Sequence, residues 1–296
     1  MTREHVRIKV PTTCGELIQG PYLAKESLIS LPINRYTEVE ARFVKDKRFA
    51  LNNGHGLQPK AAAGFLSALK HLGMDAEAAS RIEITLQSPV PQGKGYASST
   101  SDLCGVMAAV FELFESPQSP EVVASLCAGI EPSDGLMFKA WTLFDHLSGK
   151  VIRTFKSFED VKLLILEPSS ICVTETFRST ETVRAALENK TDRPLRLFEK
   201  ACDAGDLRGI FQAGAASILE HQQVLRKPYL ETVMTVAQRE GAYGVVGAHS
   251  GTILGIAMPE ALEEAVLIQR LKETGALHWY ETQLIARTVQ GGYELI

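Results

Sequence analysis

The feature that most constrains this chain is a run of glycine and hydroxyl residues that separates a strand pattern from a helix pattern, Pro91-Gln92-Gly93-Lys94-Gly95-Tyr96-Ala97-Ser98-Ser99-Thr100-Ser101-Asp102. Upstream, Ile82, Ile84 and Leu86 alternate with polar residues, which predicts a half-buried strand over 81–90. Downstream, apolar residues recur at helical spacing, which predicts a helix over 99–115. Glycines and the positive end of a helix dipole then face the same point, so the run predicts a phosphate-binding loop.

The run does not match the two common phosphate-binding signatures. Gly95 stands where a P-loop has serine or threonine after its Gly-Lys pair, and Ser98 stands where a dinucleotide-binding loop has its third glycine. From the residues alone, a serine-rich loop with an ordinary helix cap explains the run equally well.

A second candidate is an acidic turn that follows a predicted helix over 121–130. In Glu131-Pro132-Ser133-Asp134, the two carboxylates stand three positions apart around a proline. Such a turn suits a metal and substrate site, and it also suits an Asx-type cap. Without further information, the residues favour the simple turn.

Net charge, cysteine content and the lack of long apolar runs limit which partners and which cellular compartment the sequence predicts. The 296 residues carry a net charge of −4, which gives no indication of nucleic-acid or membrane binding. The five cysteines are scattered without a C-x-x-C pair, so we expect reduced thiols in a cytoplasmic protein. The charged N-terminus has no apolar signal-peptide core, and no apolar run approaches the roughly 20 residues that span a bilayer.

The rest of the chain predicts a mixture of strands and helices. We expect a strand over 5–10 ended by Pro11, strands over 28–44 broken at Pro32, a helix over 61–72, a hairpin over 138–155 and a buried strand over 161–166. Later helices are expected over 181–189, 195–204, 207–222, 229–239 and 259–273, with strands over 277–284 and 288–296. The order is typical of an α+β protein, with a domain boundary near residue 158.

The glycine and hydroxyl run resembles the second signature motif of the GHMP kinases, Pro-x-x-x-Gly-Leu-Gly-Ser-Ser-Ala-Ala. It departs from that motif at Tyr96, Ala97 and Thr100-Ser101. The same departures, together with Pro-Thr-Thr-Cys-Gly-Glu-Leu-Ile-Gln-Gly over 11–20 and the acidic turn, resemble the threonine-kinase branch of the family. The third motif is degraded, because only Ser250-Gly251 of its glycine-rich run match.

The resemblance implies the GHMP kinase two-domain fold, which has a ribosomal S5 domain 2-like N-terminal domain and a ferredoxin-like C-terminal domain. We assign these to residues 1–158 and 159–296, with the site in the crevice between them. The implied activity is the ATP- and Mg²⁺-dependent phosphorylation of the L-threonine hydroxyl to O-phospho-L-threonine, for the aminopropanol linker of cobalamin.

The resemblance also implies roles for individual residues. The nucleotide would be bound by Gly93, Gly95, Tyr96, Ala97, Ser98, Ser99 and Thr100, with Lys94 as an added catalytic charge. Ser99 and Glu131 would hold Mg²⁺, and Asp134 would either deprotonate the acceptor hydroxyl or bind the substrate ammonium. The remaining candidates for substrate binding are Glu16, Gln19, Asn34, Arg35 and Ser250.

Three alternatives stay open at this stage. One is a homoserine kinase or another small-molecule GHMP kinase, and the second is a non-catalytic metabolite-binding protein on the same fold. The third is a hydrolase or acyltransferase with Ser99 or Cys14 as nucleophile, although the chain has no Gly-x-Ser-x-Gly elbow. A small molecule is the expected partner, and a homo-oligomer is compatible with the sequence.

Overall fold

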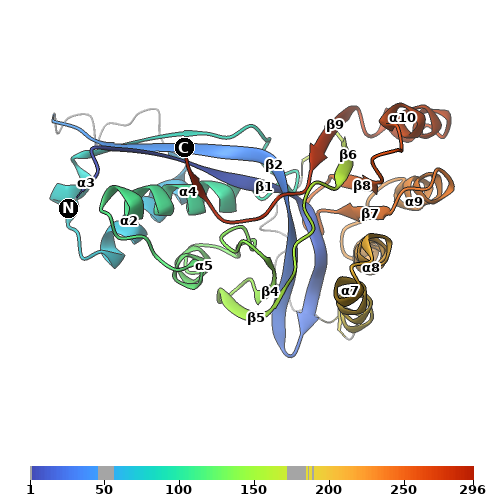
Figure 1. The fold of residues 1–296 in the computed structure, drawn as a ribbon, viewed down its shortest axis with the longest axis horizontal. Coiled ribbons are helices and arrows are strands. Elements are labelled where there is room, and N and C mark those ends of the chain that lie inside the picture. Colours follow the sequence, from blue (N-terminus) through green and yellow to red (C-terminus); the bar gives the residue numbers. More distant parts are fainter. Residues whose placement is uncertain (1, 46–56, 172–184, 186, 189) are drawn as a thin grey trace.

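The computed structural model describes the whole chain apart from residues 1, 46–56, 172–184, 186 and 189. Its described strands form one antiparallel sheet in the order β5-β4-β2-β1-β7-β8-β6-β9, with β3 paired to β2 and β10 paired to β1 (Figure 1). Helices pack on this sheet, so the predicted α+β class is confirmed. The helix expected over 181–189 lies almost entirely outside the described residues.

A long hairpin forms the centre of the sheet, from β1 (His5–Tyr22) to β2 (Lys25–Phe43). The predictions that Pro11 ends the first strand and that Pro32 breaks the second are wrong. Pro11 lies at a register shift, and the Thr13–Pro32 pair adjoins another. Proline is tolerated at such bulges because no ladder donor is required there, so both strands continue through them.

The N-terminal half has three longer helices, α2 (Pro59–His71), α4 (Ser98–Leu113) and α5 (Pro120–Ala128). Of these, α4 packs on the hairpin and on β3 (Ile82–Gln87), while the other two pack on α4. Nearly every residue of α4 is buried, between the hairpin and α2. The short helix α3 (Ala76–Ala79) precedes β3, and the predicted hairpin is present as β4 (Trp141–Asp145) and β5 (Lys150–Phe155).

In the C-terminal half, four strands carry four helices on one side (Figure 1). The strands are β6 (Lys162–Glu167), β7 (Gly244–Gly247), β8 (Leu254–Met258) and β9 (Thr282–Arg287), and β10 (Glu294–Leu295) returns to β1. The helices are α7 (Asp192–Ala204), α8 (Leu207–Glu220), α9 (Leu230–Arg239) and α10 (Glu264–Glu273).

Of the strand predicted over 288–296, only Glu294–Leu295 form a strand, β10, and the helix predicted from 195 begins at Asp192. Two further boundaries in this half differ from the prediction. Helix α10 begins at Glu264 instead of 259, and the strand expected over 277–284 begins at Thr282. Ala276–His278 form a 3-10 turn, which buries Ala276 and delays the strand. The sheet is continuous from β5 to β9, and a division of the chain at residue 158 stays a prediction.

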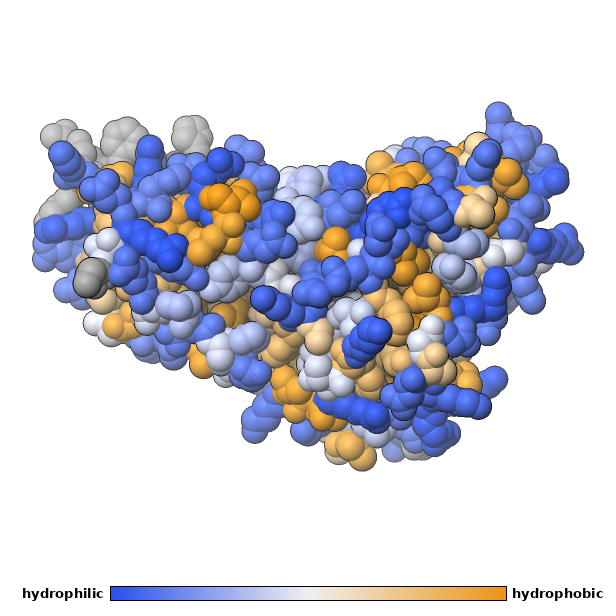
Figure 2. Space-filling model, viewed as in Figure 1, coloured by the Kyte–Doolittle hydropathy of each residue, from blue (hydrophilic) through white to orange (hydrophobic). Residues whose placement is uncertain are grey.

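The face of the molecule shown in Figure 2 is largely hydrophilic, with apolar areas over both halves. In the described part of the chain, no helix is both long enough and apolar enough to cross a membrane.

Candidate functional site

The loop between β3 and α4 has the backbone of a tight anion-binding turn. Gly93 and Gly95 have φ angles of +73° and +101°, and Ala97 has a φ of +54°. Ala97 is the N-cap of α4, and no side chain caps this helix. The first N–H groups of a helix have no intrahelical partner, so this start offers donors and a positive dipole end to a ligand.

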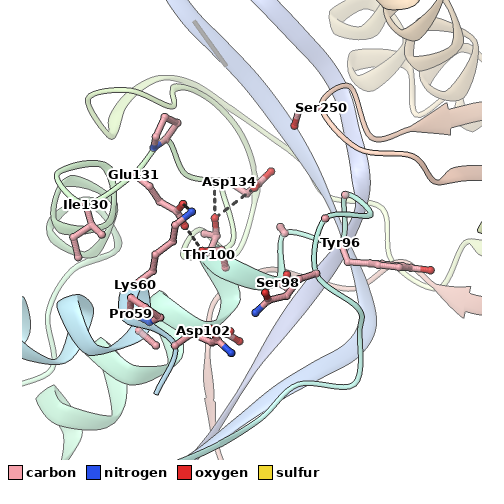
Figure 3. A pocket seen from close by; sticks show the side chains of 18 of the residues that line it. Pro59, Lys60, Tyr96, Ser98, Thr100, Asp102, Ile130, Glu131, Asp134 and Ser250 are labelled. Carbon is pink, nitrogen blue, oxygen red and sulfur yellow. Dashed lines mark hydrogen bonds and ion pairs between the residues drawn. The ribbon is translucent and has the colours of Figure 1, made fainter. Parts of the chain in front are cut away.

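A cavity of about 620 Å³ opens in front of this helix start, a size that suits a small-molecule site (Figure 3). The wall combines β1, α2, the loop, α4, the acidic turn and one residue of the C-terminal half, Ser250. Most of the site residues predicted from the sequence line it: Glu16, Gly93, Gly95, Tyr96, Ala97, Ser98, Ser99, Thr100, Glu131, Asp134 and Ser250.

Glu131 lies just beyond α5 and faces the start of α4. One carboxylate oxygen, Oε1, accepts a hydrogen bond from the Ser99 hydroxyl. The other, Oε2, lies 2.5 Å from the ammonium of Lys60. Lys60 was missed by the sequence prediction. The one feature of the sequence that could have indicated Lys60 is its position in the first turn of α2, where the helix dipole favours an acidic residue and not a lysine.

Asp134 is held at the base of the cavity by hydroxyl groups from two elements. Ser30 of β2 donates to Oδ1 at 3.3 Å, and Thr100 of α4 lies 3.4 Å from Oδ2. The backbone N–H of Asp134 also donates to the Thr100 hydroxyl at 3.1 Å. Asp134 is buried and still lines the cavity, so its carboxylate is fixed in direction before any ligand binds.

Asp102 is a second cavity residue that the sequence prediction missed. It lies in α4, is buried, and has one oxygen 3.4 Å from the Thr37 hydroxyl. Burial raises its pKa to about 7, the nearby charge of Glu131 adds to this, and the Thr37 contact opposes it. An acid near the start of a helix is common at exposed positions, so nothing in the sequence marked Asp102 as buried.

Glu16 reaches the cavity from β1 and is fixed by His249. Its Oε2 accepts the backbone N–H of His249 at 2.7 Å and the ring Nδ1 at 3.0 Å. The Nε2 atom of the ring lies 2.9 Å from the Ser217 hydroxyl. Burial and the charge of Lys227 lower the pKa of His249 to about 3. A neutral imidazole therefore holds Glu16 by donating from Nδ1.

Three segments that are far apart in the sequence meet at the loop. The N–H groups of Thr13 and Gly15 donate to the carbonyls of Tyr96 and Gly95 at 2.9 and 3.2 Å. From the C-terminal half, the N–H of Thr252 donates to the Lys94 carbonyl at 2.8 Å. The structure thus brings the three motif segments together.

Four predicted site residues do not line the cavity. The Lys94 ammonium is buried, contacts the Pro168 carbonyl and lies 3.5 Å from Glu167 Oε1, which gives no support to a catalytic charge at this position. Asn34 Oδ1 accepts from the Arg287 N–H at 2.8 Å, and Arg35 donates to the Pro89 carbonyl at 3.2 Å. The main chain of Gln19 bonds to Ser217 and His221 behind Glu16.

The donors at the start of α4 suit a hard divalent cation. The Ser99 hydroxyl and the Glu131 carboxylate are oxygen ligands in contact with each other. Mg²⁺ in phosphoryl-transfer sites commonly takes only one or two protein ligands and completes its shell with phosphate and water. Within the described ranges, no group of three or more His, Cys, Asp or Glu residues could hold a metal ion.

Comparison with known proteins finds similarity to one family of kinases. Residues 60–138 match the GHMP kinases N terminal domain. The chain is 29% identical to an L-threonine kinase of Citrobacter freundii, over 96% of this chain and 98% of the relative. It is 26% identical to an L-threonine kinase of Salmonella typhimurium, over 96% and 94%. A homoserine kinase structure from Cytophaga hutchinsonii has the same fold, with a TM-score of 0.70 and 13% identity over 99% and 98% of the two chains.

Proposed function

We propose that this chain, which has the GHMP kinase fold, is a member of the GHMP kinase superfamily and transfers a phosphoryl group from ATP to the hydroxyl of L-threonine. The observation that carries the proposal is the contact between Ser99 and Glu131 at an uncapped helix start, with Asp134 in the same cavity. Phosphoryl transfer needs a phosphate cradle, a cation and a held acceptor, and this arrangement has a candidate for each.

The loop before α4 binds the polyphosphate in this proposal. Its glycines allow close approach, and the N–H groups at Ser98, Ser99 and Thr100 stabilise charge on the transferred group. Ser99 and Glu131 hold Mg²⁺, which when bound neutralises phosphate charge. Lys94 is reassigned to holding the loop, because its ammonium is paired with Glu167.

Asp134 and Glu16 act on the acceptor. Asp134 is a fixed hydrogen-bond acceptor in the cavity, so it orients the threonine hydroxyl and takes its proton. Glu16 is a second acid in the wall of the cavity, held by His249, and it binds the substrate ammonium. Arg35 lies outside the cavity wall and is not part of this assignment.

The threonine assignment rests on similarity, since two L-threonine kinases align over nearly the whole chain. Homoserine is the competing acceptor, because it shares the ammonium, carboxylate and hydroxyl groups. We place the product in cobalamin linker synthesis and the reaction in the cytoplasm, where ATP is available and where the free thiols of Cys14, Cys104, Cys127 and Cys202 remain reduced.

The proposal is tested by identifying the product. The protein is incubated with MgATP and L-threonine, and the mixture is followed by phosphorus NMR and by mass spectrometry of the amino acid. We expect one phosphate ester on the threonine hydroxyl and an equal amount of ADP. ADP without a phosphorylated amino acid would contradict the acceptor, and protein that consumes no ATP with any hydroxy amino acid would contradict the kinase assignment.

A further inference from the structure

The charges that line the cavity are unbalanced for a polyphosphate ligand. In the described part of the wall, Lys60 is the one lysine or arginine, whereas the same wall contains four acids, Glu16, Asp102, Glu131 and Asp134. A nucleotide triphosphate adds further negative charge to this space. To bind the nucleotide, the protein therefore needs a positive group that contacts the phosphates and is not held by the protein carboxylates.

Lys60 is positioned to supply one such charge. It follows Pro59 in the first turn of α2, and its side chain crosses the cavity wall towards Glu131 (Figure 3). The side chain is 40% exposed, whereas that of Glu131 is 11% exposed. A half-exposed lysine has a flexible four-carbon stem and can exchange one anionic partner for another.

The ammonium of Lys60 sits on the carboxylate that is assigned to the metal. Lys60 contacts Oε2 of Glu131 while Ser99 contacts Oε1, so each oxygen of the carboxylate has a donor. A divalent cation on the same carboxylate would repel the ammonium. Lys60 and the metal are therefore competitors for Glu131.

We infer that Lys60 is an exchangeable cation: it holds Glu131 in the nucleotide-free protein and moves to the ATP polyphosphate when a divalent cation takes over the carboxylate. This inference rests on the proposed kinase function and adds a nucleotide-binding residue to it. The exchange also keeps the carboxylate of Glu131 in one orientation between turnovers, because either Lys60 or the divalent cation is bound to it at every stage.

The test measures metal and nucleotide binding separately and uses no acceptor. Binding of Mn²⁺ without nucleotide is followed by electron paramagnetic resonance, and binding of a non-hydrolysable ATP analogue with Mg²⁺ by calorimetry. The variants are Lys60→Met, Lys60→Gln and Lys60→Arg. Lys70→Met is the matched control, because Lys70 is an exposed lysine in the last turn of the same helix.

Removal of the competing charge should move the two affinities in opposite directions. We expect Lys60→Met and Lys60→Gln to bind Mn²⁺ roughly tenfold more tightly, equivalent to about 1.4 kcal/mol, and the analogue roughly tenfold more weakly. Lys60→Arg and Lys70→Met should stay close to the parent protein in both measurements.

Two results would overturn the inference. Unchanged Mn²⁺ affinity in both neutral variants would mean that Lys60 does not compete for Glu131. Unchanged analogue affinity would mean that it does not reach the phosphates. Neither measurement contains threonine, so the two tests are independent. If the Mn²⁺ and analogue affinities shift in opposite directions but the protein does not phosphorylate threonine, the role of Lys60 is supported and only the assignment of threonine as acceptor is rejected.

Discussion

The carboxylate of Glu131 has a different donor on each oxygen, the Ser99 hydroxyl on Oε1 and the Lys60 ammonium on Oε2. Resemblance to a family motif identified Ser99 and Glu131, because those residues stand at fixed places in the sequence. It did not identify Lys60 or Asp102. Their part in the cavity depends on how α2 and α4 face the acidic turn, which is a property of packing and not of spacing.

Replacing Glu131 with glutamine should reduce turnover far more than stability. The amide keeps the shape and an acceptor for Ser99, but it loses the charge that a divalent cation needs. We expect kcat to fall roughly 10²–10³-fold, the usual cost of one electrostatic group in an active site, with little change in Tm. Glu121→Gln, on the exposed side of α5, is the control. Full activity in Glu131→Gln would refute the metal assignment.

Asp102 should make the stability of the nucleotide-free protein depend on pH. Its folded-state pKa is raised from 3.8 to about 7, so the folded protein binds the proton more tightly than the unfolded chain. This contribution to the free energy of unfolding is full below pH 3.8, declines as the pH rises towards 7, and is lost above it.

Urea unfolding at several pH values measures this dependence. Asp102→Asn removes the titrating group, so the decline between pH 5 and about 7 should become shallower than in the parent protein. The exposed Asp203→Asn should leave the decline unchanged. An identical pH profile for Asp102→Asn and the parent would show that Asp102 is already ionised throughout this range.

At the scale of elements, the loop between β3 and α4 is fixed by contacts from β1, from the end of β6 and from the segment between β7 and β8. Tyr96 donates to Glu167 Oε2 at 2.7 Å, and Lys94 lies beside the same carboxylate. The sequence correctly predicted a strand, a glycine turn and a helix in this order. It predicted a catalytic role for Lys94, because a lysine between glycines resembles a phosphate ligand. The ion-pair partner of Lys94, Glu167, lies 73 positions further along the chain, so the sequence did not reveal the pair.

Lys94→Met should therefore behave as a structural change. It removes one partner of a largely buried ion pair and leaves Glu167 without that charge. Breaking such pairs costs about 3 kcal/mol of folding free energy. We expect a lower Tm and a nearly unchanged KM for ATP at a temperature where the variant is folded. A stable variant with strongly raised KM for ATP would restore the catalytic interpretation of Lys94.

Gly95→Ala tests the junction of the three segments. A Cβ atom on Gly95 would lie 2.0 Å from the Cβ of Ala248, and its φ of +101° disfavours any side chain. The loop and the segment after β7 must separate, so we expect losses of both stability and activity. Gly73→Ala is the matched control, since it has a φ of +70° and no atom within 4 Å of the added Cβ. Equal effects of the two substitutions would show that the contact with Ala248 is unimportant.

At the scale of the whole molecule, one antiparallel sheet carries residues of the cavity from both halves. Glu16 of β1 pairs with Gly247 of β7, and this pairing brings His249 to Glu16 and Ser250 to the cavity. The α+β class followed from periodicity alone. The continuity of the sheet and the passage of its strands through Pro11 and Pro32 did not, because register between distant segments is set by tertiary pairing and bulges.

The central claim is that this cavity phosphorylates L-threonine, and its most direct test is kcat/KM for L-threonine, L-serine and L-homoserine at saturating MgATP. A pocket that contacts the β-methyl group gains about 1–3 kcal/mol from it, so L-threonine should exceed L-serine by roughly 10–200-fold. We predict that L-threonine also exceeds L-homoserine. A clear preference for L-homoserine would contradict the threonine assignment but would still support a kinase activity. Turnover of none of the three amino acids would contradict the proposed function as a whole.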